Sequence, residues 1–168
     1  MNNIEKLFLS AYDDYAAKIL RHVYFRVNNK SLSEDLTSET FMKAWNYLRE
    51  GNEVKNLKGF LYKIADNLVI DYYREKSHRE ISLDNVKETP DWGKAPSTAE
   101  NFDKKVDIDL VKKHLNELPN DYKQILIHRF INDLSIKEIK EITGKSMTNI
   151  YVMIHRGLKM LKEKIKNV

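Results

Sequence analysis

Apolar residues recur every three or four positions along most of the chain, which is the spacing that places them on one face of an α-helix. The first stripe predicts a long N-terminal helix and consists of Ile4, Phe8, Ala11, Tyr15 and Ile19. A second helix is expected to open on the capping-box pair Ser31 and Glu34 and to end at Gly51. Its stripe is Phe41, Ala44, Trp45 and Leu48. A third begins near Asn56 and carries Leu57, Leu61, Ile64 and Leu68, so the N-terminal part reads as three or four helices.

The same spacing returns towards the C-terminus and predicts a second group of helices. Its first stripe is Ile108, Val111, Leu115 and Leu118. Pro119 then starts a new helix, at a position where its missing N–H costs nothing. Ser135 and Glu138 form another capping box and open a short helix, and a turn at Gly144 follows. Ser146 caps a last helix, whose predicted inward face is Met147, Ile150, Ile154, Leu158, Leu161 and Ile165.

Between the two groups, from residue 79 to 104, the periodicity fades. Two of the three prolines of the chain, Pro90 and Pro96, lie there, and such a composition predicts a flexible linker. The chain has 168 residues, 42% of them hydrophobic, which is enough for two modest cores. The pattern therefore predicts an all-α protein of two small helical domains, 1–78 and 105–168, joined by the linker 79–104.

Several classes of protein are disfavoured by what the composition lacks. No run of about 18 apolar residues occurs, so we expect no membrane insertion. Residues 1–5 lack the basic flank and apolar core of a secretory signal. The chain has no Cys, which excludes disulfides and thiolate metal sites. We therefore expect a cytoplasmic protein.

Positive charge is concentrated at the C-terminal end of the chain. The net charge is +4, and residues 134–168 alone hold eight Lys or Arg and three Glu. A basic terminal segment is typical of a protein that binds a polyanion. A lysine-rich helix end in water explains the charge equally well, so charge alone leaves both interpretations open.

Residues 134–161 have the layout of a helix-turn-helix, with a short capped helix, a turn containing Gly144 and a longer helix. This arrangement projects the first half of the second helix into the major groove of DNA. Side chains expected off the inward stripe and within reach of DNA are Thr148, Asn149, Tyr151, Val152, His155 and Arg156. Ser146 and the free N–H groups beside it are candidates for holding a phosphate. Such patterns also occur by chance in helical hairpins, but together with the charge this one favours DNA binding.

Residues 59–74 interleave aromatic and basic side chains on the predicted third helix. One outward row is Lys63, Asn67, Ile70 and Arg74, with Tyr62, Asp66 and Tyr73 beside it and Lys58, Phe60, Tyr72, Lys76 and Arg79 close in sequence. Single-stranded DNA needs rings that stack on its bases and cations that follow its backbone. The short amide of Asn67 suits hydrogen bonds to a flipped base. On the residues alone, tyrosines that cover the edge of a small core are the favoured alternative.

Residues 35–45 place a polar patch at the start of the predicted second helix. The side chains expected to leave the inward stripe are Asp35, Thr37, Glu39, Thr40 and Lys43. They form either a docking surface or a helix start whose acids stabilise the helix dipole. The residue types do not separate these two readings.

In this order and separation, three segments resemble the extracytoplasmic-function (ECF) group of sigma factors, which belong to the sigma-70 family of bacterial RNA polymerase. DLTSETFMKAW, residues 35–45, is similar to the family's region 2.2. GFLYKIADNLVIDYYR, residues 59–74, is similar to regions 2.3–2.4, and residues 118–161 are similar to region 4. The resemblance covers nearly the whole chain. It implies a protein that recruits RNA polymerase to a promoter and helps to open it.

The resemblance also implies a role for each segment. Core polymerase, through the coiled coil of its β′ subunit and with the β subunit as a further contact, would be bound by Asp35, Thr37, Glu39, Thr40 and Trp45. The −10 promoter element would be read and melted by Phe60, Tyr62, Lys63, Asn67, Ile70, Tyr73, Arg74 and Lys76. The −35 element would be bound by Lys145, Ser146, Thr148, Asn149, Tyr151, Val152, His155, Arg156 and Lys159. An anti-sigma factor is a further implied partner, and no metal or cofactor is implied.

A few positions depart from the family's usual pattern. Lys140 stands near the helix-turn-helix corner where Ala is usual, and its stem is expected to snorkel outward. Tyr151 and Met153 stand where Lys or Arg is common, which shifts weight to phosphate contacts by Lys145, Arg156 and Lys159. Asp66 stands where the family often has Arg, and an acid beside the single strand would repel phosphate.

Three other functions fit these residues less well. An enzyme is disfavoured because no two His are three to five residues apart and no phosphate loop, H-E-x-x-H or nucleophile elbow occurs. A stand-alone helix-turn-helix regulator would not need residues 35–45 or 59–74. A pure interaction protein that has lost DNA binding is motivated by Lys140, Tyr151 and Met153.

Overall fold

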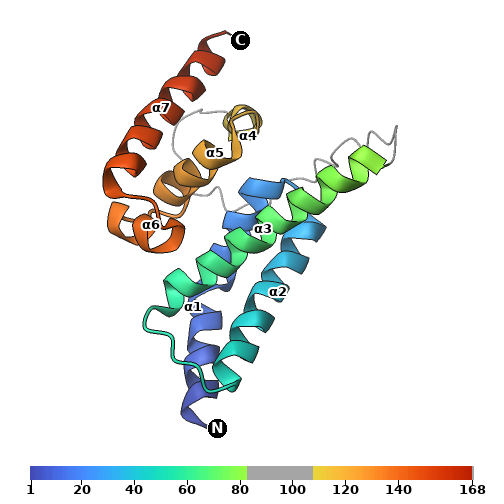
Figure 1. Cartoon of the computed structure of the whole chain (residues 1–168), viewed down its shortest axis with the longest axis vertical. Coiled ribbons are helices and arrows are strands. Elements are labelled where there is room, and N and C mark those ends of the chain that lie inside the picture. Colours follow the sequence, from blue (N-terminus) through green and yellow to red (C-terminus); the bar gives the residue numbers. More distant parts are fainter. Residues whose placement is uncertain (83–107, 168) are drawn as a thin grey trace. The chain divides into compact units, whose positions relative to one another are not determined.

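The structure is a computed structural model that describes residues 1–82 and 108–167. Within these residues every regular element is helical, and the helices fall into two compact units, α1 to α3 and α4 to α7 (Figure 1). The predicted all-α, two-unit architecture is confirmed. The predicted linker lies outside the described residues except for its first four positions, which continue α3. The two domain boundaries stay predictions.

The first unit is a bundle of α1 (Asn3–Val27), α2 (Lys30–Arg49) and α3 (Leu57–Ser82), each packed on the other two. Helix α1 opens on a capping box between Asn2 and Glu5. Helix α2 opens on Asn29, whose side chain accepts a hydrogen bond from the N–H of Leu32. The predicted cap at Ser31 is therefore wrong, because an equally good cap two residues earlier starts the helix sooner.

The core of the first unit takes side chains from all three helices. Its fully buried side chains include Ile19, Val23, Phe41, Ala44, Leu61, Ala65 and Val69. The predicted stripes supply most of these residues, while Phe8, Tyr15 and Trp45 lie half-buried at the edge. Burial of such side chains, at roughly 25 cal/mol per Å² of apolar surface, is what holds a bundle of this size together.

The second unit packs three α-helices and a short π-helix with α7 (Met147–Lys166). They are α4 (Ile108–Asn116), α5 (Asn120–Leu126), η1 (Ile127–Ile131) and α6 (Ile136–Thr143). Pro119 caps α5, so it precedes the first helical position instead of occupying it. The carboxylate of Glu117 lies 3.3 Å from His114 Nδ1 and 3.4 Å from Lys164 Nζ. These contacts lower the pKa of Glu117, and the hydrogen bond with His114 is the largest cause.

Helices α6 and α7 form the predicted helix-turn-helix. The capping box of Ser135 and Glu138 opens α6, and Ser146 caps α7 by accepting a hydrogen bond from the N–H of Asn149 at 3.1 Å. Gly144 ends α6 with φ of 72°, in the left-handed region that favours glycine. All three predicted signals are confirmed.

The face of α7 that is buried differs from the face that the sequence predicts. Ile150, Met153 and Gly157 are buried, whereas Met147, Leu158 and Ile165 are 42%, 40% and 38% exposed. A Cβ on Gly157 would lie 3.1 Å from Leu126 Cδ1, so the missing side chain lets α5 approach closely. This close packing, and not the longest apolar stripe, sets the side of α7 that faces inward.

Candidate nucleic-acid and polymerase interfaces

The outward row predicted on α3 is exposed as expected. Lys63, Asn67, Ile70 and Arg74 all reach the surface, and Ile70 is 40% exposed. Their spacing of three or four residues places them along one side of the helix. Arg74 lies 3.8 Å from Asp71, but this pair is exposed and constrains the guanidinium little. The row therefore offers two cations, one amide and one apolar side chain to a ligand.

The aromatic side chains around this row have structural contacts that the sequence did not reveal. Tyr62 is buried with its ring edge-on to the His22 ring, at 5.5 Å between centroids, so its predicted place beside the outward row is wrong. Phe60 is half-buried against Tyr47, with centroids 5.0 Å apart. The hydroxyl of Tyr73 donates to the main-chain carbonyl of Arg26 at 2.7 Å. Burial, the largest cause, raises the pKa of Tyr73.

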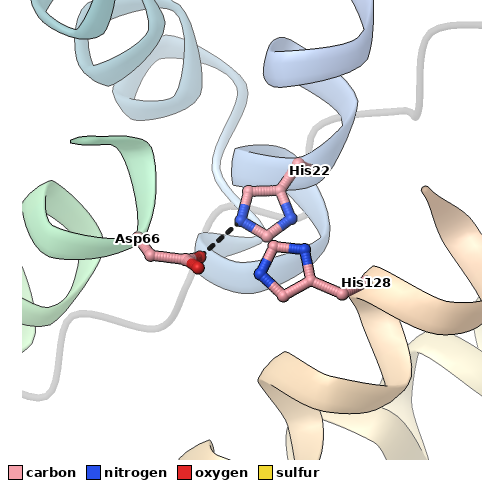
Figure 2. Close-up of side chains that lie close together, drawn as sticks. All are labelled: His22, Asp66 and His128. Carbon is pink, nitrogen blue, oxygen red and sulfur yellow. Dashed lines mark hydrogen bonds and ion pairs between the residues drawn. The ribbon is translucent and has the colours of Figure 1, made fainter. Parts of the chain in front are cut away.

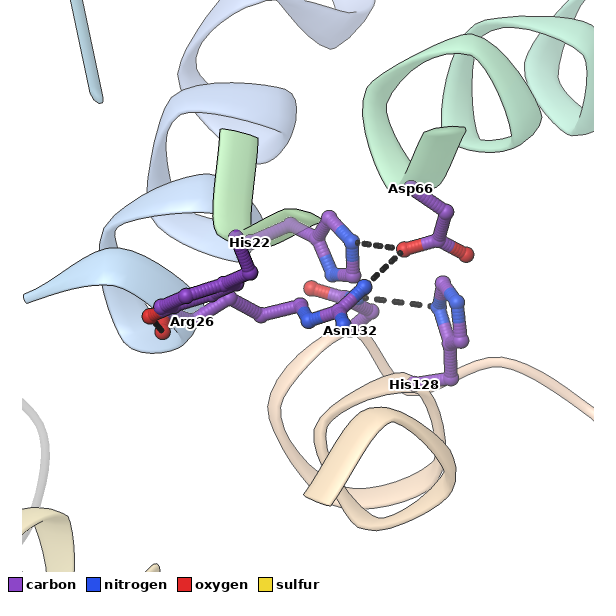
Figure 3. Close-up of polar contacts among 6 residues, drawn as sticks. His22, Arg26, Asp66, His128 and Asn132 are labelled. Atoms are coloured by element: carbon purple, nitrogen blue, oxygen red, sulfur yellow. Dashed lines mark hydrogen bonds and ion pairs between the residues drawn. The ribbon is translucent and has the colours of Figure 1, made fainter. Parts of the chain in front are cut away.

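Asp66 also points away from the outward row. Figure 2 shows its carboxylate bonded to His22, with Oδ1 2.7 Å from the ring Nε2. The same oxygen accepts from Nη1 of Arg26 at 3.0 Å (Figure 3). All three side chains are buried. The expectation that Asp66 would repel phosphate beside a single strand is therefore wrong, because this carboxylate joins α3 to α1.

The polar patch predicted at the start of α2 divides into exposed acids and buried threonines. Asp35 and Glu39 are exposed. Thr37 and Thr40 are buried, and the Thr40 hydroxyl donates to the carbonyl of Leu36 at 2.8 Å. The expectation that both threonines leave the inward face is wrong. Thr40 satisfies its hydroxyl on its own helix and is still buried, whereas the buried Thr37 hydroxyl has no hydrogen-bond partner among the described residues. Trp45 is half-buried, with its ring 5.1 Å from that of Phe8.

Helix α7 presents a mixed polar and basic face. Exposed along it are Thr148, Asn149, Tyr151, Val152, His155, Arg156 and Lys159, as expected. Lys145 is half-buried, and the exposed Ser146 hydroxyl caps the helix. Met153 is buried, so it fills the core and does not replace a DNA-reading residue. Lys140 is exposed near the corner, which agrees with a lysine stem directed outward.

The described residues were also compared with the requirements of a metal site and of a membrane-spanning helix. Within the described part of either unit, no three His, Asp or Glu side chains lie close enough to share a metal ion. None of the described helices is long and apolar enough to cross a membrane.

Comparison with known families shows matches to both units. Residues 11–79 match the family described as Sigma-70 region 2, and residues 109–161 match Sigma-70, region 4. The chain belongs to the sigma-70 family. Together the two matches take in all of α2 and α6 and most of α3 and α7, so each candidate surface lies within a sigma region. This sigma factor is of the ECF type, as the resemblance implied.

Individual relatives cover nearly the full length of the sigma factor. RNA polymerase sigma factor SigV of Bacillus subtilis is 29% identical over 93% of this chain and 89% of its own. ECF RNA polymerase sigma factor SigM of the same organism is 28% identical over 90% of each. ECF RNA polymerase sigma factor BldN of Streptomyces coelicolor is 27% identical, and the match spans 57% of its length.

Solved structures of low sequence identity share the fold. The sigma factor RpoE, in complex with the anti-sigma factor NepR from Bartonella quintana, has a TM-score of 0.80 at 22% identity. The match covers 96% of this chain and 98% of that one. CnrH, in complex with the cytosolic domain of CnrY, has a TM-score of 0.71 at 15% identity, over 97% of this chain and 90% of that one.

Family membership decides between the functions left open above. Sigma factors are transcription initiation factors that bind RNA polymerase and promoter DNA, and they are not enzymes. A stand-alone helix-turn-helix regulator is not favoured, because region 2 accounts for the first unit from α1 to α3. The function of the sigma factor is therefore established at the level of the family.

Proposed function

We propose that this ECF sigma factor divides promoter recognition among three helices. The exposed acids of α2 dock on the coiled coil of the β′ subunit of core polymerase. The outward row of α3 binds the melted −10 element, and the exposed face of α7 binds the −35 element. The observation that carries the proposal is the separation of faces on α3, where Asp66 and Tyr73 are held by α1 while Lys63, Asn67, Ile70 and Arg74 stay exposed.

The chemistry of the α3 row suits a single strand. Lys63 and Arg74 stand at its two ends and are placed to follow the phosphate backbone. Asn67 offers both a donor and an acceptor for the edge of an unstacked base, and Ile70 offers an apolar surface to the base next to it. Because Tyr62 is buried and the Tyr73 hydroxyl is occupied, base stacking on tyrosine contributes less than the residue types alone suggested.

Helix α7 supplies a different kind of contact. Lys145, Arg156 and Lys159 are placed for phosphates, which position a protein on DNA without reading the sequence. Near the helix start, Asn149 can bond a base edge and Tyr151, which is 58% exposed, can pack on a thymine methyl group. With few basic side chains towards the bases, we expect modest discrimination at the −35 element.

The proposal includes two further points about the cellular setting. An anti-sigma factor binds this chain, as NepR binds RpoE in the similar structure. The sigma factor works in the cytoplasm, because its partners are core polymerase and promoter DNA.

A run-off transcription assay with purified core polymerase and genomic promoter fragments tests the proposal. Transcripts that require the sigma factor, and that are lost with Asn67→Ala or Arg156→Ala, would support the assigned surfaces. Core binding that survives Glu39→Lys would show that the acids of α2 are not the docking face. Transcription that survives all three substitutions would contradict the assignment as a whole.

A further inference from the structure

Helix α7 carries a second apolar stripe beside the side that packs into its own unit. The inward side consists of Ile150, Met153 and Gly157, which are buried. Six residues make up the second stripe; four of them are 38% to 58% exposed, and Ile154 and Leu161 are half-buried. Alternately four and three positions apart, they are Met147, Tyr151, Ile154, Leu158, Leu161 and Ile165. The described helices therefore leave this stripe largely uncovered.

The spacing of the second stripe is that of a coiled-coil seam. Apolar residues at alternating steps of three and four keep facing a second helix along its length. The alternation runs unbroken over nearly all of α7 (Figure 1), and at 1.5 Å per residue it extends for about 27 Å. A contiguous exposed apolar surface marks an interaction site, so the stripe has the form of a surface that receives another helix.

The charges of α7 are confined to one half of the helix, and they favour a particular occupant. Residues 147–155 contain no Lys, Arg, Asp or Glu, whereas residues 156–166 contain five Lys or Arg and one Glu. A parallel pair of such helices would place two basic halves side by side, where like charges repel. An antiparallel pair places each basic half beside an uncharged half and opposes the two helix dipoles. A second copy of α7 in the antiparallel direction is therefore compatible in charge.

The antiparallel arrangement also matches the stripe to itself. With a two-fold axis beside Arg156, every residue of the stripe lies opposite another residue of the stripe. At the flank of this seam, Lys162 lies beside Thr148 of the second copy and not beside another lysine. Each apolar contact forms twice, and the pairs are Met147 with Ile165, Tyr151 with Leu161, and Ile154 with Leu158.

We propose that two copies of this sigma factor associate through the second stripe as an antiparallel pair of α7 helices, and that this pair does not bind the −35 element. The effect on promoter binding rests on the −35 face of α7 proposed above. The major groove is about 12 Å wide, and one helix with its side chains, about 10–12 Å across, fills it. A second helix packed about 8–10 Å away therefore keeps α7 out of the groove. Dilution and promoter DNA both favour the single chain by mass action.

Sedimentation equilibrium of the full-length protein over a range of concentrations tests the association. Leu158→Gln and Ile165→Gln make the stripe polar with a residue that forms helices well. Leu7→Gln is the matched control, because Leu7 is an exposed leucine of a helix outside the second unit. We expect each stripe variant to weaken the dimer about tenfold or more, since a two-fold pair contains each substitution twice, and Leu7→Gln to leave it unchanged.

A wild type that stays monomeric at every concentration would overturn the inference and leave the stripe to a different partner. A dimer that neither stripe variant weakens, although both variants are folded by circular dichroism, would overturn it as well.

Cross-linking tests the direction of the two helices. The chain has no Cys, so Met147→Cys and Ile165→Cys each introduce a single thiol at one end of the seam. In the antiparallel pair these two ends meet, and a short bismaleimide should link the variants only when they are mixed. Links within either variant alone would show a parallel pair and contradict the proposed arrangement.

Run-off transcription with core polymerase tests the effect on the promoter. The linked pair should be at least about tenfold less active than the same two variants capped singly with N-ethylmaleimide, because the link holds the second helix at a high effective concentration. Equal activity would overturn the masking of the −35 face while leaving the dimer in place. If Arg156→Ala has no effect on transcription by the single chain, the −35 face itself has failed and the sedimentation result still decides the dimer.

Discussion

Removal of the Asp66 carboxylate is expected to destabilise the first unit severely. In Asp66→Ala, the guanidinium of Arg26 and the ring of His22 lose the oxygen that lies 3.0 and 2.7 Å from them. All three side chains are at most 4% exposed, so water does not take over that role without a rearrangement. Loss of one partner of a buried ion pair costs about 3–5 kcal/mol. The free energy of unfolding of a typical domain is about 5–15 kcal/mol, so the substitution would remove a large part of it.

The same helix provides a matched control. Asp71 also pairs with an arginine of this chain, Arg74, but at 3.8 Å and with both side chains more than half exposed. An exposed pair of this kind contributes about 0–1 kcal/mol, so Asp71→Ala should change stability little. Both substitutions replace Asp by Ala on α3, so helix propensity changes by the same amount in each.

Urea unfolding of the full chain measures both effects. The chain has two tryptophans, and in a Trp92→Phe background Trp45 on α2 reports on the first unit alone. We expect Asp66→Ala to lower the free energy of unfolding of this unit by at least about 3 kcal/mol and Asp71→Ala by less than about 1. Equal effects of the two substitutions would refute the reasoning, since they would show that Asp66 is not a buried ion-pair partner in solution.

Three further outcomes are expected. Tyr73→Phe removes the hydrogen bond to the Arg26 carbonyl and should cost about 0.5–1.5 kcal/mol in the same urea assay. The pKa of Tyr73 is raised in the folded state. The stability that this shift contributes is therefore complete below the pKa of tyrosine in the unfolded chain and is lost as the pH rises through the pKa in the folded protein. The wild type should therefore lose stability more steeply than Tyr73→Phe as the pH rises above about 10. Asn67→Ala should reduce promoter opening, measured by permanganate reactivity, more than core binding; equal losses would indicate a folding defect instead. Arg156→Ala should weaken DNA binding about equally on all promoter sequences in a competition assay, and loss of discrimination at one base pair would contradict a phosphate contact.

Helix positions were predictable from the chain because local signals set them. The capping box at Ser135, the left-handed Gly144 and the cap at Ser146 each act within a few residues, and all three are present. The start of α2 shows the limit of such signals. Asn29 and Ser31 are both good caps, and the choice between them depends on the path of the chain after α1.

The faces of the helices were less predictable, because packing partners far away in the chain decide them. On α7 two apolar stripes overlap, and Gly157 belongs to neither by residue type, yet its contact with Leu126 selects the buried side. On α2, Thr40 reads as polar but satisfies its hydroxyl on Leu36 and is buried. Gly157 was the available signal on α7, because a glycine inside a long helix often marks a close approach.

Asp66 could not be placed by periodicity at all. Its partners lie 40 and 44 residues earlier, and nothing in a single sequence pairs His22 and Arg26 with it. The departure from the family's usual Arg was visible, but its meaning depended on the side of α3 that faces α1. A position that looked unfavourable for DNA binding is in fact a position that builds the core.

The contacts of Arg26 explain how α3 is held with one side outward. Its guanidinium bonds Asp66, and its carbonyl accepts from Tyr73, so one residue of α1 holds two points of α3 that are seven residues apart. Seven residues make about two helical turns, so both points lie on the same side of α3. A shift of α3 by a single residue would rotate this side by about 100° and break both contacts. The two bonds therefore fix the direction of Lys63, Asn67, Ile70 and Arg74, so this row is already oriented before any ligand binds.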